Sequence, residues 1–418
     1  MIVFFCFEKT LKVYQNEFGF SYEHKFEKVP STDKGTQLPF ENIYFSTPSD
    51  FHNHMENIKN QIGENAGKVN VLEPPQVVNH PQFPKHIGFL ESWDKVLETV
   101  KEASPGNGPV KLAILNAMSN AIGDHLIGMQ AFDYYQEKLR KDLGREIDIS
   151  FYQLNPYRVA PITKQWHGKF QHIYMLPNRL ARLVENDVFV DLGTLLLRDN
   201  FDNQHMIDFF FEALSLDSAQ VPSEAKRTKY KILPEVDAEL NKAFNILKGK
   251  GRPILLFHRT STSPIRMMSE MRARNMIAEI IKKTDYFVIS ADRLEYQNKR
   301  FMDFSRYSSD VEHFAGIISK VDGVVTVDTA TYHIADAFDV PTVVLFTTIN
   351  PDYRIKYYPF TQPVMLEDEE GRLYGRHKAD KDENKAKEEI EYVDKKWGEL
   401  SVDTILGALE TAKTRKEV

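Results

Sequence analysis

Two successive runs in which short apolar strands alternate with helices constrain the fold of this chain more than any other feature. The first run starts near Val110 and includes a helical pattern from Asp124 to about Leu143. Its expected strands lie at residues 111–116, 147–154, 172–176 and 188–192. Strands separated by helices at such spacing form βαβ units around a parallel sheet. The first run therefore predicts a Rossmann-like domain.

The second run starts the same pattern again at Pro253. Its expected strands lie at residues 254–257, 286–290, 323–327 and 342–346, and its expected helices at residues 269–283, 309–319 and 331–338. A second series of βαβ units predicts a second parallel sheet. We therefore expect an α/β fold with two tandem Rossmann-like domains.

The remaining segments set the expected domain boundaries. Residues 221–233, which are charged and contain proline, are expected to join the two domains. The predicted parts are an N-terminal extension over 1–108, a first Rossmann-like domain over 109–233, a second over 234–365, and a tail over 366–418. In the tail we expect a solvated charge run over 366–395 and a last helix that Ser401 caps.

The N-terminal extension is expected to hold β-strands over residues 1–30 and a helix near 91–101. Aromatic residues recur along the predicted strands and would share one face, namely Phe18, Phe20, Tyr22 and Phe26. Such a face needs a cover. Either the first Rossmann-like domain or a second copy of the chain can supply it, which leaves a homo-oligomer open.

Charge and cysteine content exclude several classes of protein. The net charge of −7 argues against a nucleic-acid-binding surface, which needs a basic footprint. Cys6 is the only cysteine, so an intrachain disulfide and a cysteine-ligated metal or iron–sulfur site are both excluded.

No apolar run approaches the roughly 20 residues that cross a bilayer. We expect a cytoplasmic protein with at most peripheral contact at the inner face of the inner membrane.

The loop that leads into the helix of the first run carries one candidate catalytic group. It contains Asn120 and Gly123 and ends on Asp124, at the edge of a parallel sheet where ligands bind. Asp124 has two interpretations. It is either the N-cap of the helix, the commonest use of aspartate at such a position, or a general base.

Two further segments follow strands of the second run. Arg259, Thr260, Ser261 and Arg266 offer hydroxyl and guanidinium donors to a phosphate chain, although a polar loop with helix caps fits the same residues. After residues 323–327 come groups at the start of a short helix, where free amides bind anions, namely Asp328, Thr329, Ala330 and His333. His333 alone fits a core histidine equally well.

Several familiar sites are absent from the sequence. No G-x-G-x-x-G follows a strand, and neither a P-loop motif nor an H-E-x-x-H occurs. Asp380 and Asp382 match the D-x-D spelling of metal-dependent sugar transferases, but they lie within the charge run and are read as solvated. We therefore expect no metal and no cofactor.

Together the three segments resemble the heptosyltransferase-like glycosyltransferases of family 9, which have the GT-B fold. The resemblance covers roughly residues 110–365. Residues 120–124 are similar to the family's S-x-G-D motif, residues 258–261 to its H-A-T-T/S motif, and residues 327–333 to its D-T-G-x-x-H motif. Some protein-modifying members carry a cysteine-ligated iron site, which a chain with one cysteine lacks.

The resemblance implies a role for each matched residue. Asp124 would be the catalytic base, and Glu295 would hold the donor ribose. Arg266 would bind phosphate in place of a lysine, and the remaining matched residues would bind the donor as well, namely Thr260, Ser261, Asp328, Thr329, Ala330 and His333. Arg259, Asn120 and Gly123 are secondary candidates. Three departures affect the donor: Arg266 for lysine, Ala330 for glycine, and residues 347–351 for G-P-T-D/N-P.

The implied reaction is inverting, metal-independent transfer of a sugar, heptose first, from a nucleotide diphosphate donor such as ADP-heptose. The acceptor would be a hydroxyl of a protein or of a glycan, as in lipopolysaccharide biosynthesis. Two alternatives remain: a nucleotide-sugar-binding partner subunit without strong catalysis, and a GT-B sugar-nucleotide epimerase.

Overall fold

The computed structural model describes residues 2–5, 43–45, 69–72, 83–115, 121–153, 170–176, 178–192, 195, 203–228, 232, 234–375, 379–380 and 382–417. They belong to two compact units. The first comprises Met1–Asn120, Ala131–Phe201 and Ile207–Val221, and the second comprises Ala121–Gln130, Asp202–Met206 and Pro222–Val418. Phe18, Phe20, Tyr22 and Phe26 lie outside the described residues.

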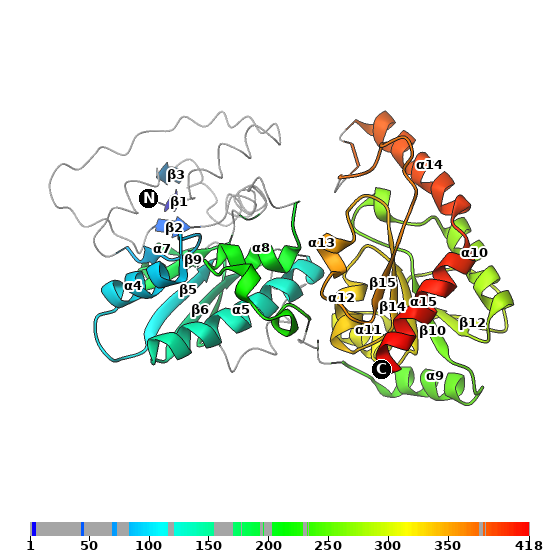
Figure 1. The fold of residues 1–418 in the computed structure, drawn as a ribbon, viewed down its shortest axis with the longest axis horizontal. Coiled ribbons are helices and arrows are strands. Elements are labelled where there is room, and N and C mark those ends of the chain that lie inside the picture. The colour runs from blue at the N-terminus through cyan, green and yellow to red at the C-terminus, as the bar shows by residue number, and fades with distance from the viewer. Residues whose placement is uncertain are drawn as a thin grey trace. The chain divides into compact units, whose positions relative to one another are not determined.

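The first unit contains a five-stranded parallel sheet (Figure 1). Its strands in spatial order are β4 (Lys85–His86), β9 (Val188–Asp191), β5 (Val110–Leu115), β6 (Ile147–Gln153) and β7 (His172–Met175). The helices of this part of the chain are α4 (Trp93–Ala103), α5 (Ile122–Leu143), α7 (Leu180–Leu183) and α8 (Met206–Ala213). The strands predicted at 111–116, 147–154, 172–176 and 188–192 are therefore confirmed.

A second, four-stranded sheet of the first unit uses strands of the N-terminal segment. In spatial order they are β3 (Val69–Leu72), β1 (Ile2–Phe5), β2 (Ile43–Phe45) and β8 (Asn178–Arg179). Strand β1 pairs in parallel with both neighbours, and β2 pairs antiparallel with β8. This confirms that the N-terminal segment contains β-strands, and within residues 1–30 the part that the structure describes is β1.

The helix predicted near residues 91–101 is confirmed as α4. Ser92 caps it by accepting a hydrogen bond from the backbone N–H of Lys95 at 3.2 Å. Val96 and Val100 are fully buried, so the helix packs into the first unit. Strand β4 pairs with β9 of the five-stranded sheet, and α4 packs into the same unit. Residues before 109 are therefore part of the fold of this unit.

The second unit contains a six-stranded sheet in which every pair of neighbours is parallel. In spatial order its strands are β12 (Phe301–Asp303), β11 (Phe287–Ser290), β10 (Ile254–His258), β13 (Gly323–Val327), β14 (Thr342–Phe346) and β15 (Thr361–Met365). Numbered along the chain, this is the 3-2-1-4-5-6 order of the doubly wound dinucleotide-binding fold. Two parallel sheets with intervening helices confirm the predicted α/β class.

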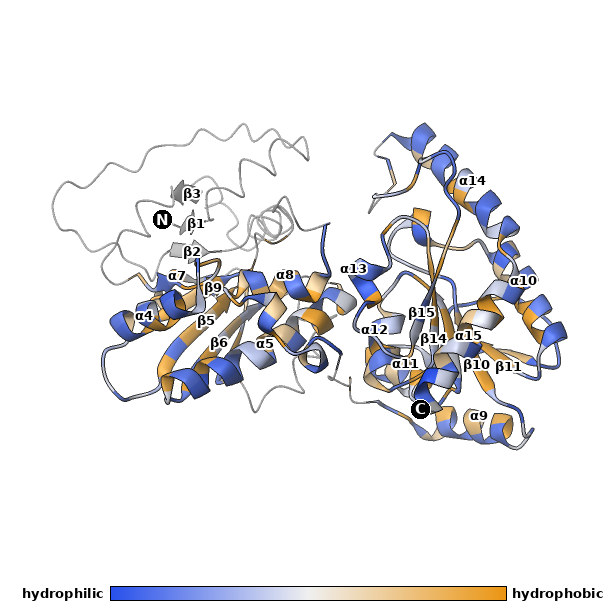
Figure 2. Ribbon diagram, in the orientation of Figure 1, coloured by the Kyte–Doolittle hydropathy of each residue, from blue (hydrophilic) through white to orange (hydrophobic). Residues whose placement is uncertain are grey.

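Helices cover both faces of this sheet. They are α9 (Ala238–Lys248), α10 (Glu270–Lys283), α11 (Val311–Ile318), α12 (Thr331–Ala337), α13 (Asp352–Ile355), α14 (Glu383–Glu399) and α15 (Val402–Glu417). Along β14, Val343 and Leu345 face the core beneath α10, α14 and α15, while Val344 and Phe346 face α12 and α13. Alternate residues of a strand point to opposite faces, and a strand buried on both faces is continuously apolar (Figure 2).

The prediction that residues 366–395 form a solvated charge run is wrong over α14. This helix is polar along much of its length (Figure 2), but Tyr392, Val393 and Trp397 are buried in the core of the second unit. The indole N–H of Trp397 donates to the carbonyl of Met267 at 2.9 Å. Three large apolar residues therefore outweigh the surrounding charges and anchor the helix.

The predicted cap of the last helix agrees with the structure, since Ser401 Oγ accepts from the backbone N–H of Asp403 at 3.2 Å. Within the described ranges, no helix is both long and apolar enough to span a membrane.

Candidate functional site

The candidate site lies in the second unit, at the carboxyl ends of β10 and β13. These strands are adjacent, with His258 paired to Thr326 near their ends. They are the first and fourth strands of the 3-2-1-4-5-6 order, so the chain leaves them in opposite directions. Ligands of open α/β sheets bind at this switch point. The two motif segments predicted to bind phosphate follow directly from these strands.

Asp328 links the two segments. Its carboxylate accepts from Arg266 Nη1 at 2.9 Å and from the Tyr332 hydroxyl at 3.0 Å, and its side chain is buried. Its backbone carbonyl accepts from Ser261 Oγ at 2.9 Å. Arg266 also donates to Thr262 Oγ1 at 3.2 Å. The loop after β10 and the turn after β13 are thus held together, and Asp328 orients the guanidinium.

His258 at the end of β10 makes a second link. Its Nδ1 lies 2.7 Å from Thr331 Oγ1, and its Nε2 lies 3.1 Å from Thr260 Oγ1. Burial, together with the neighbouring Arg259 cation, lowers the pKa of His258 from 6.5 to about 4. The imidazole is therefore neutral at pH 7 and positions two hydroxyl groups instead of contributing a charge.

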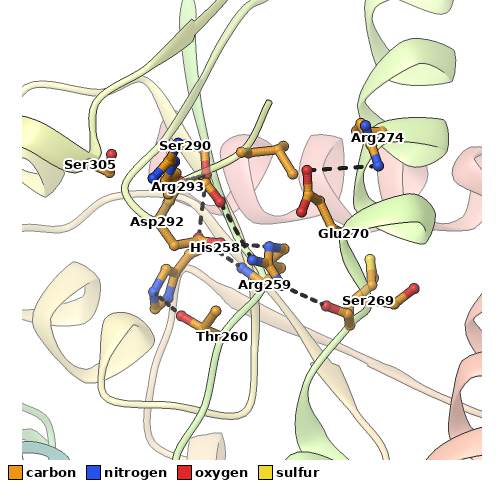
Figure 3. Close-up of polar contacts among 12 residues, drawn as sticks. His258, Arg259, Thr260, Ser269, Glu270, Arg274, Ser290, Asp292, Arg293 and Ser305 are labelled. Carbon is orange, nitrogen blue, oxygen red and sulfur yellow. Dashed lines mark hydrogen bonds and ion pairs between the residues drawn. The ribbon is translucent and has the colours of Figure 1, made fainter. Parts of the chain in front are cut away.

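Arg259 forms a separate ion pair (Figure 3). Its Nε lies 2.7 Å from Asp292 Oδ2, and its Nη1 donates to the carbonyl of Met268 at 3.2 Å. Ser290 Oγ donates to the Asp292 carbonyl at 2.8 Å. Burial raises the pKa of Asp292, although the guanidinium opposes this shift. Arg259 thus joins the ends of β10 and β11, whereas Arg266 belongs to the cluster around Asp328.

Glu295 lies further along the same loop after β11. It pairs with Arg293 at 3.0 Å, and the two side chains are 75% and 80% exposed. Such an exposed pair contributes little to stability. Asp292, three residues earlier, is the acid of this loop that is partly buried beside the strand ends.

The turn after β13 carries three of the predicted donor-binding residues. Thr329 and Ala330 are partly exposed, and Ala330 has φ −55° and ψ −19°. This is ordinary right-handed helical backbone, so the conformation itself does not require the glycine of the D-T-G motif. His333 follows in α12 and is 4% exposed, with Nδ1 at 2.6 Å from the Tyr358 hydroxyl.

Asp124 is the third residue of α5. The backbone N–H of His125 donates to the carbonyl of Ala121 at 3.0 Å, so the first turn already includes Asp124 and its interpretation as the N-cap is wrong. An acid in the first turn remains favourable to the helix dipole. Asn120 lies outside the described residues.

Gly123 lies in the part of α5 that belongs to the second unit. A Cβ atom at this position would come 2.8 Å from Cδ2 and 3.2 Å from Nε2 of His333. Within the second unit, the Gly-Asp pair and the histidine of the third motif are therefore neighbours, although they are 210 residues apart in the sequence.

Sequence reasoning missed the side chains that hold these groups in place. Tyr332 binds Asp328, and Tyr358 binds both His333 and Thr228. No local pattern in the sequence marks a tyrosine whose hydroxyl is buried and hydrogen-bonded. The partners of such a hydroxyl lie on distant segments that only the fold brings together.

The fold and site together define an α/β protein with two Rossmann-like sheets, the second of which presents a cation and several hydroxyls at its switch point. Residues 309–384 match the family model of glycosyltransferase family 9 (heptosyltransferase). This match contains Asp328 and His333. It supports the resemblance drawn from the third motif and, with it, the prediction of a glycosyltransferase. No curated protein matches the sequence at a significant level.

Solved structures similar to this chain include a family 9 glycosyltransferase from Veillonella parvula, with 14% identity, TM-score 0.47, and coverage of 74% of this chain and 99% of that one. The ADP-heptose lipopolysaccharide heptosyltransferase II of E. coli has 12% identity, TM-score 0.43, and coverage of 68% and 98%. The iron-containing dodecameric glycosyltransferase TibC of enterotoxigenic E. coli has 12% identity, TM-score 0.49, and coverage of 74% and 76%.

Among the described residues, no group of three or more histidine, cysteine, aspartate or glutamate side chains is placed to hold a metal ion. Asp380 and Asp382 have a structural role instead. Asp382 caps α14 by accepting from the backbone N–H groups of Asn384 and Lys385, and Asp380 accepts from the N–H of Asp382.

Proposed function

We propose that this protein transfers a sugar from a nucleoside diphosphate donor to a hydroxyl group, with inversion at the anomeric carbon and without a metal ion. The observation that carries the proposal is the cluster around Arg266 at the switch point. A guanidinium held by a buried carboxylate, beside several hydroxyl groups, suits the recognition of phosphate oxygens.

The leaving group of this reaction is a nucleoside diphosphate, on which negative charge grows as the sugar departs. Arg266, Thr260, Ser261 and the amides around Thr329 and Ala330 are the groups that would stabilise this charge. Preorganised donors of this kind are usually the largest contribution to such catalysis. Asp328 fixes Arg266 before the substrate binds, which supports preorganisation.

The base in this proposal is Asp124, which would accept the proton of the attacking hydroxyl. Its place in the first turn of α5 and the approach of Gly123 to His333 support this role. Direct attack by the acceptor inverts the anomeric centre. No metal is required, because Arg266 and the hydrogen-bond donors neutralise the diphosphate.

The sugar we propose first is heptose, with ADP-heptose as the donor, because of the family match over residues 309–384. The acceptor class is a glycan of the lipopolysaccharide type, another surface glycan or a protein hydroxyl. We place the reaction in the cytoplasm, with peripheral contact at the inner face of the membrane. Self-association of the chain is compatible with this reaction.

A screen of nucleotide sugars by thermal shift, followed by turnover assays with and without acceptor, tests the proposal. We expect stabilisation by a nucleoside diphosphate sugar, and a product whose anomeric configuration, measured by NMR, is opposite to that of the donor. Conversion of the donor alone would instead identify an epimerase. Binding without turnover, with acceptors of all three classes, would indicate a partner subunit. Retention of configuration would contradict direct attack.

A further inference from the structure

His333 stands at one end of a chain of three buried hydrogen-bonding side chains in the second unit. Thr228 Oγ1 donates to the Tyr358 hydroxyl at 3.0 Å, and that hydroxyl lies 2.6 Å from His333 Nδ1. The exposed fractions of Thr228, Tyr358 and His333 are 3%, 3% and 4%. Because all three side chains are shielded from water, each hydrogen bond constrains the next.

The start of this chain is itself fixed. The backbone N–H of Thr228 donates to Asp336 Oδ2 at 3.1 Å, and Arg227 donates to the carbonyl of Asp336 at 3.0 Å. Arg227 also forms an ion pair with Asp339. The segment that carries Thr228 is therefore attached to the end of the same helix, α12, whose first turn carries His333.

The protonation states of these groups determine where the imidazole proton resides. Burial, the Arg354 cation and His205 lower the pKa of His333 well below 6.5, so the ring is neutral. Burial raises the pKa of Tyr358, so its hydroxyl keeps its single hydrogen. Since Tyr358 accepts from Thr228, its own hydrogen is available to His333 Nδ1, and the ring proton then resides on Nε2.

The Nε2 edge of the ring faces the first turn of α5. A Cβ on Gly123 would lie 3.2 Å from Nε2, and Asp124 is the next residue. The donor of the imidazole is thus presented to the turn that carries the proposed base.

We propose that Thr228 and Tyr358 are positioning residues that hold His333 as the neutral Nε2–H tautomer, with this N–H directed at the first turn of α5 as a fixed hydrogen-bond donor. The effect of this tautomer on catalysis rests on the proposed function. The tautomer itself does not depend on any substrate. His333 in this role neither takes up nor releases a proton during the transfer.

The tautomer is read directly by long-range ¹H–¹⁵N correlation of the full chain labelled with [¹⁵N]histidine. The spectrum of His333→Gln identifies the His333 signals among the 13 histidines. We expect the Nε2–H pattern from pH 6 to pH 8 in the unmodified protein, and a mixture of tautomers in Tyr358→Phe. Thr228→Val removes the hydroxyl that donates to Tyr358 and leaves the rings of Tyr358 and His333 unaltered. It should give the same mixture of tautomers. An Nδ1–H ring in the unmodified protein would overturn the proposal.

Turnover supplies the second readout. A glutamine amide reaches the position of Nε2, whereas the shorter asparagine amide reaches that of Nδ1. We expect His333→Gln to retain about tenfold more kcat than His333→Asn, with KM for the donor changing less than kcat. Loss of one neutral hydrogen bond in Thr228→Val should lower kcat by about 5–10-fold. His313→Gln in α11, whose ring pairs with Asp310, is the control and should leave kcat unchanged.

Two outcomes separate this inference from the proposed function. If asparagine at position 333 equals or exceeds glutamine, the role of the Nε2 donor is wrong even when the transfer is found. If no nucleotide sugar is turned over but the tautomer depends on Thr228 and Tyr358 as expected, the positioning chain stands and the proposed function fails.

Discussion

Arg266 and Asp328 form an ion pair at the switch point of the second sheet, with 2.9 Å between Nη1 and Oδ2. The cation expected to bind phosphate is therefore held in place by a partner, and the aspartate expected to contact the donor is a buried support for that cation. The pair joins the loop after β10 to the turn after β13. Mutation of either residue acts on both the nucleotide affinity and the stability of the second unit.

Arg266→Ala should weaken nucleoside diphosphate binding by about 1.5–3 kcal/mol, the cost of a lost charge-assisted hydrogen bond. It should also lower the free energy of unfolding, because the Asp328 carboxylate loses its charged partner. Arg266→Lys should recover much of the affinity. Calorimetry with ADP and urea unfolding measure the two effects.

The double variant Arg266→Ala with Asp328→Asn separates these effects. Removing both charges should restore part of the stability but none of the affinity. If the single alanine variant binds ADP as tightly as the unmodified protein, the phosphates lie elsewhere, with Arg259 as the next candidate.

Asp124→Asn should leave folding nearly intact and reduce kcat by ~10²–10⁴, the usual range for a positioned general base. Asparagine keeps the size of the side chain, and the carbonyl of Ala121 still accepts the first hydrogen bond of α5. Single-turnover assays, corrected for the folded fraction by circular dichroism, give the rate. A variant that is less stable but has an unchanged rate per folded molecule would show that Asp124 serves only the helix.

Activity should survive EDTA, because the proposed neutralisation of the diphosphate uses Arg266 and hydrogen-bond donors. Asp382→Ala tests whether the D-x-D pattern of Asp380 and Asp382 binds a metal ion needed for activity. It should destabilise α14 by about 1 kcal/mol through loss of the cap, and kcat should not change. Activity that requires added Mg²⁺ or Mn²⁺ and disappears in Asp382→Ala would contradict both statements.

Stability should fall on acidification partly through His258. Its pKa is lowered from 6.5 to about 4 in the folded protein, so the unfolded chain binds the proton first. This contribution is complete above pH 6.5 and is lost as the pH falls towards 4, by up to roughly 3 kcal/mol. His258→Gln cannot titrate. Urea unfolding at pH 7, 5.5 and 4.5 should therefore give a shallower decline for the variant, and parallel declines would contradict the neutral state of His258 at pH 7.

The sequence patterns located the elements well where each strand is buried on both faces. Residues 323–327 and 342–346 were predicted with the bounds of β13 and β14, since continuous apolar runs end where the chain becomes polar. The prediction of a solvated segment failed for α14, because the few buried residues of this helix are separated by charged ones. The number of charged residues does not reveal that Trp397 reaches the core of the second unit.

The candidate site was predictable only in part. Motif residues at strand ends, such as Ser261 and Asp328, meet because parallel strands bring their carboxyl ends to one edge. Their actual partners depend on segments far away, as Thr228 and Tyr358 show by lying 130 residues apart. The exposed pairing of Glu295 with Arg293 likewise depends on how the loop after β11 turns, which spacing does not encode.

Gly123→Ala tests the contact between the first turn of α5 and His333. The added Cβ would lie 2.8 Å from His333 Cδ2, a separation that real Cβ atoms essentially never show. The imidazole cannot turn away freely, because Tyr358 holds its Nδ1 at 2.6 Å. We therefore expect a shift of the first turn of α5 and a decrease in kcat of at least about tenfold, since small displacements of catalytic groups have large effects on rate. Gly407→Ala in α15 is the matched control, because no atom other than its chain neighbours and the backbone of its own helix lies within 4 Å of its added Cβ. It should stabilise the protein by up to about 1 kcal/mol through helix propensity and leave kcat unchanged. Equal, unaffected turnover in both alanine variants would mean that the approach of α5 to His333 has no part in the reaction.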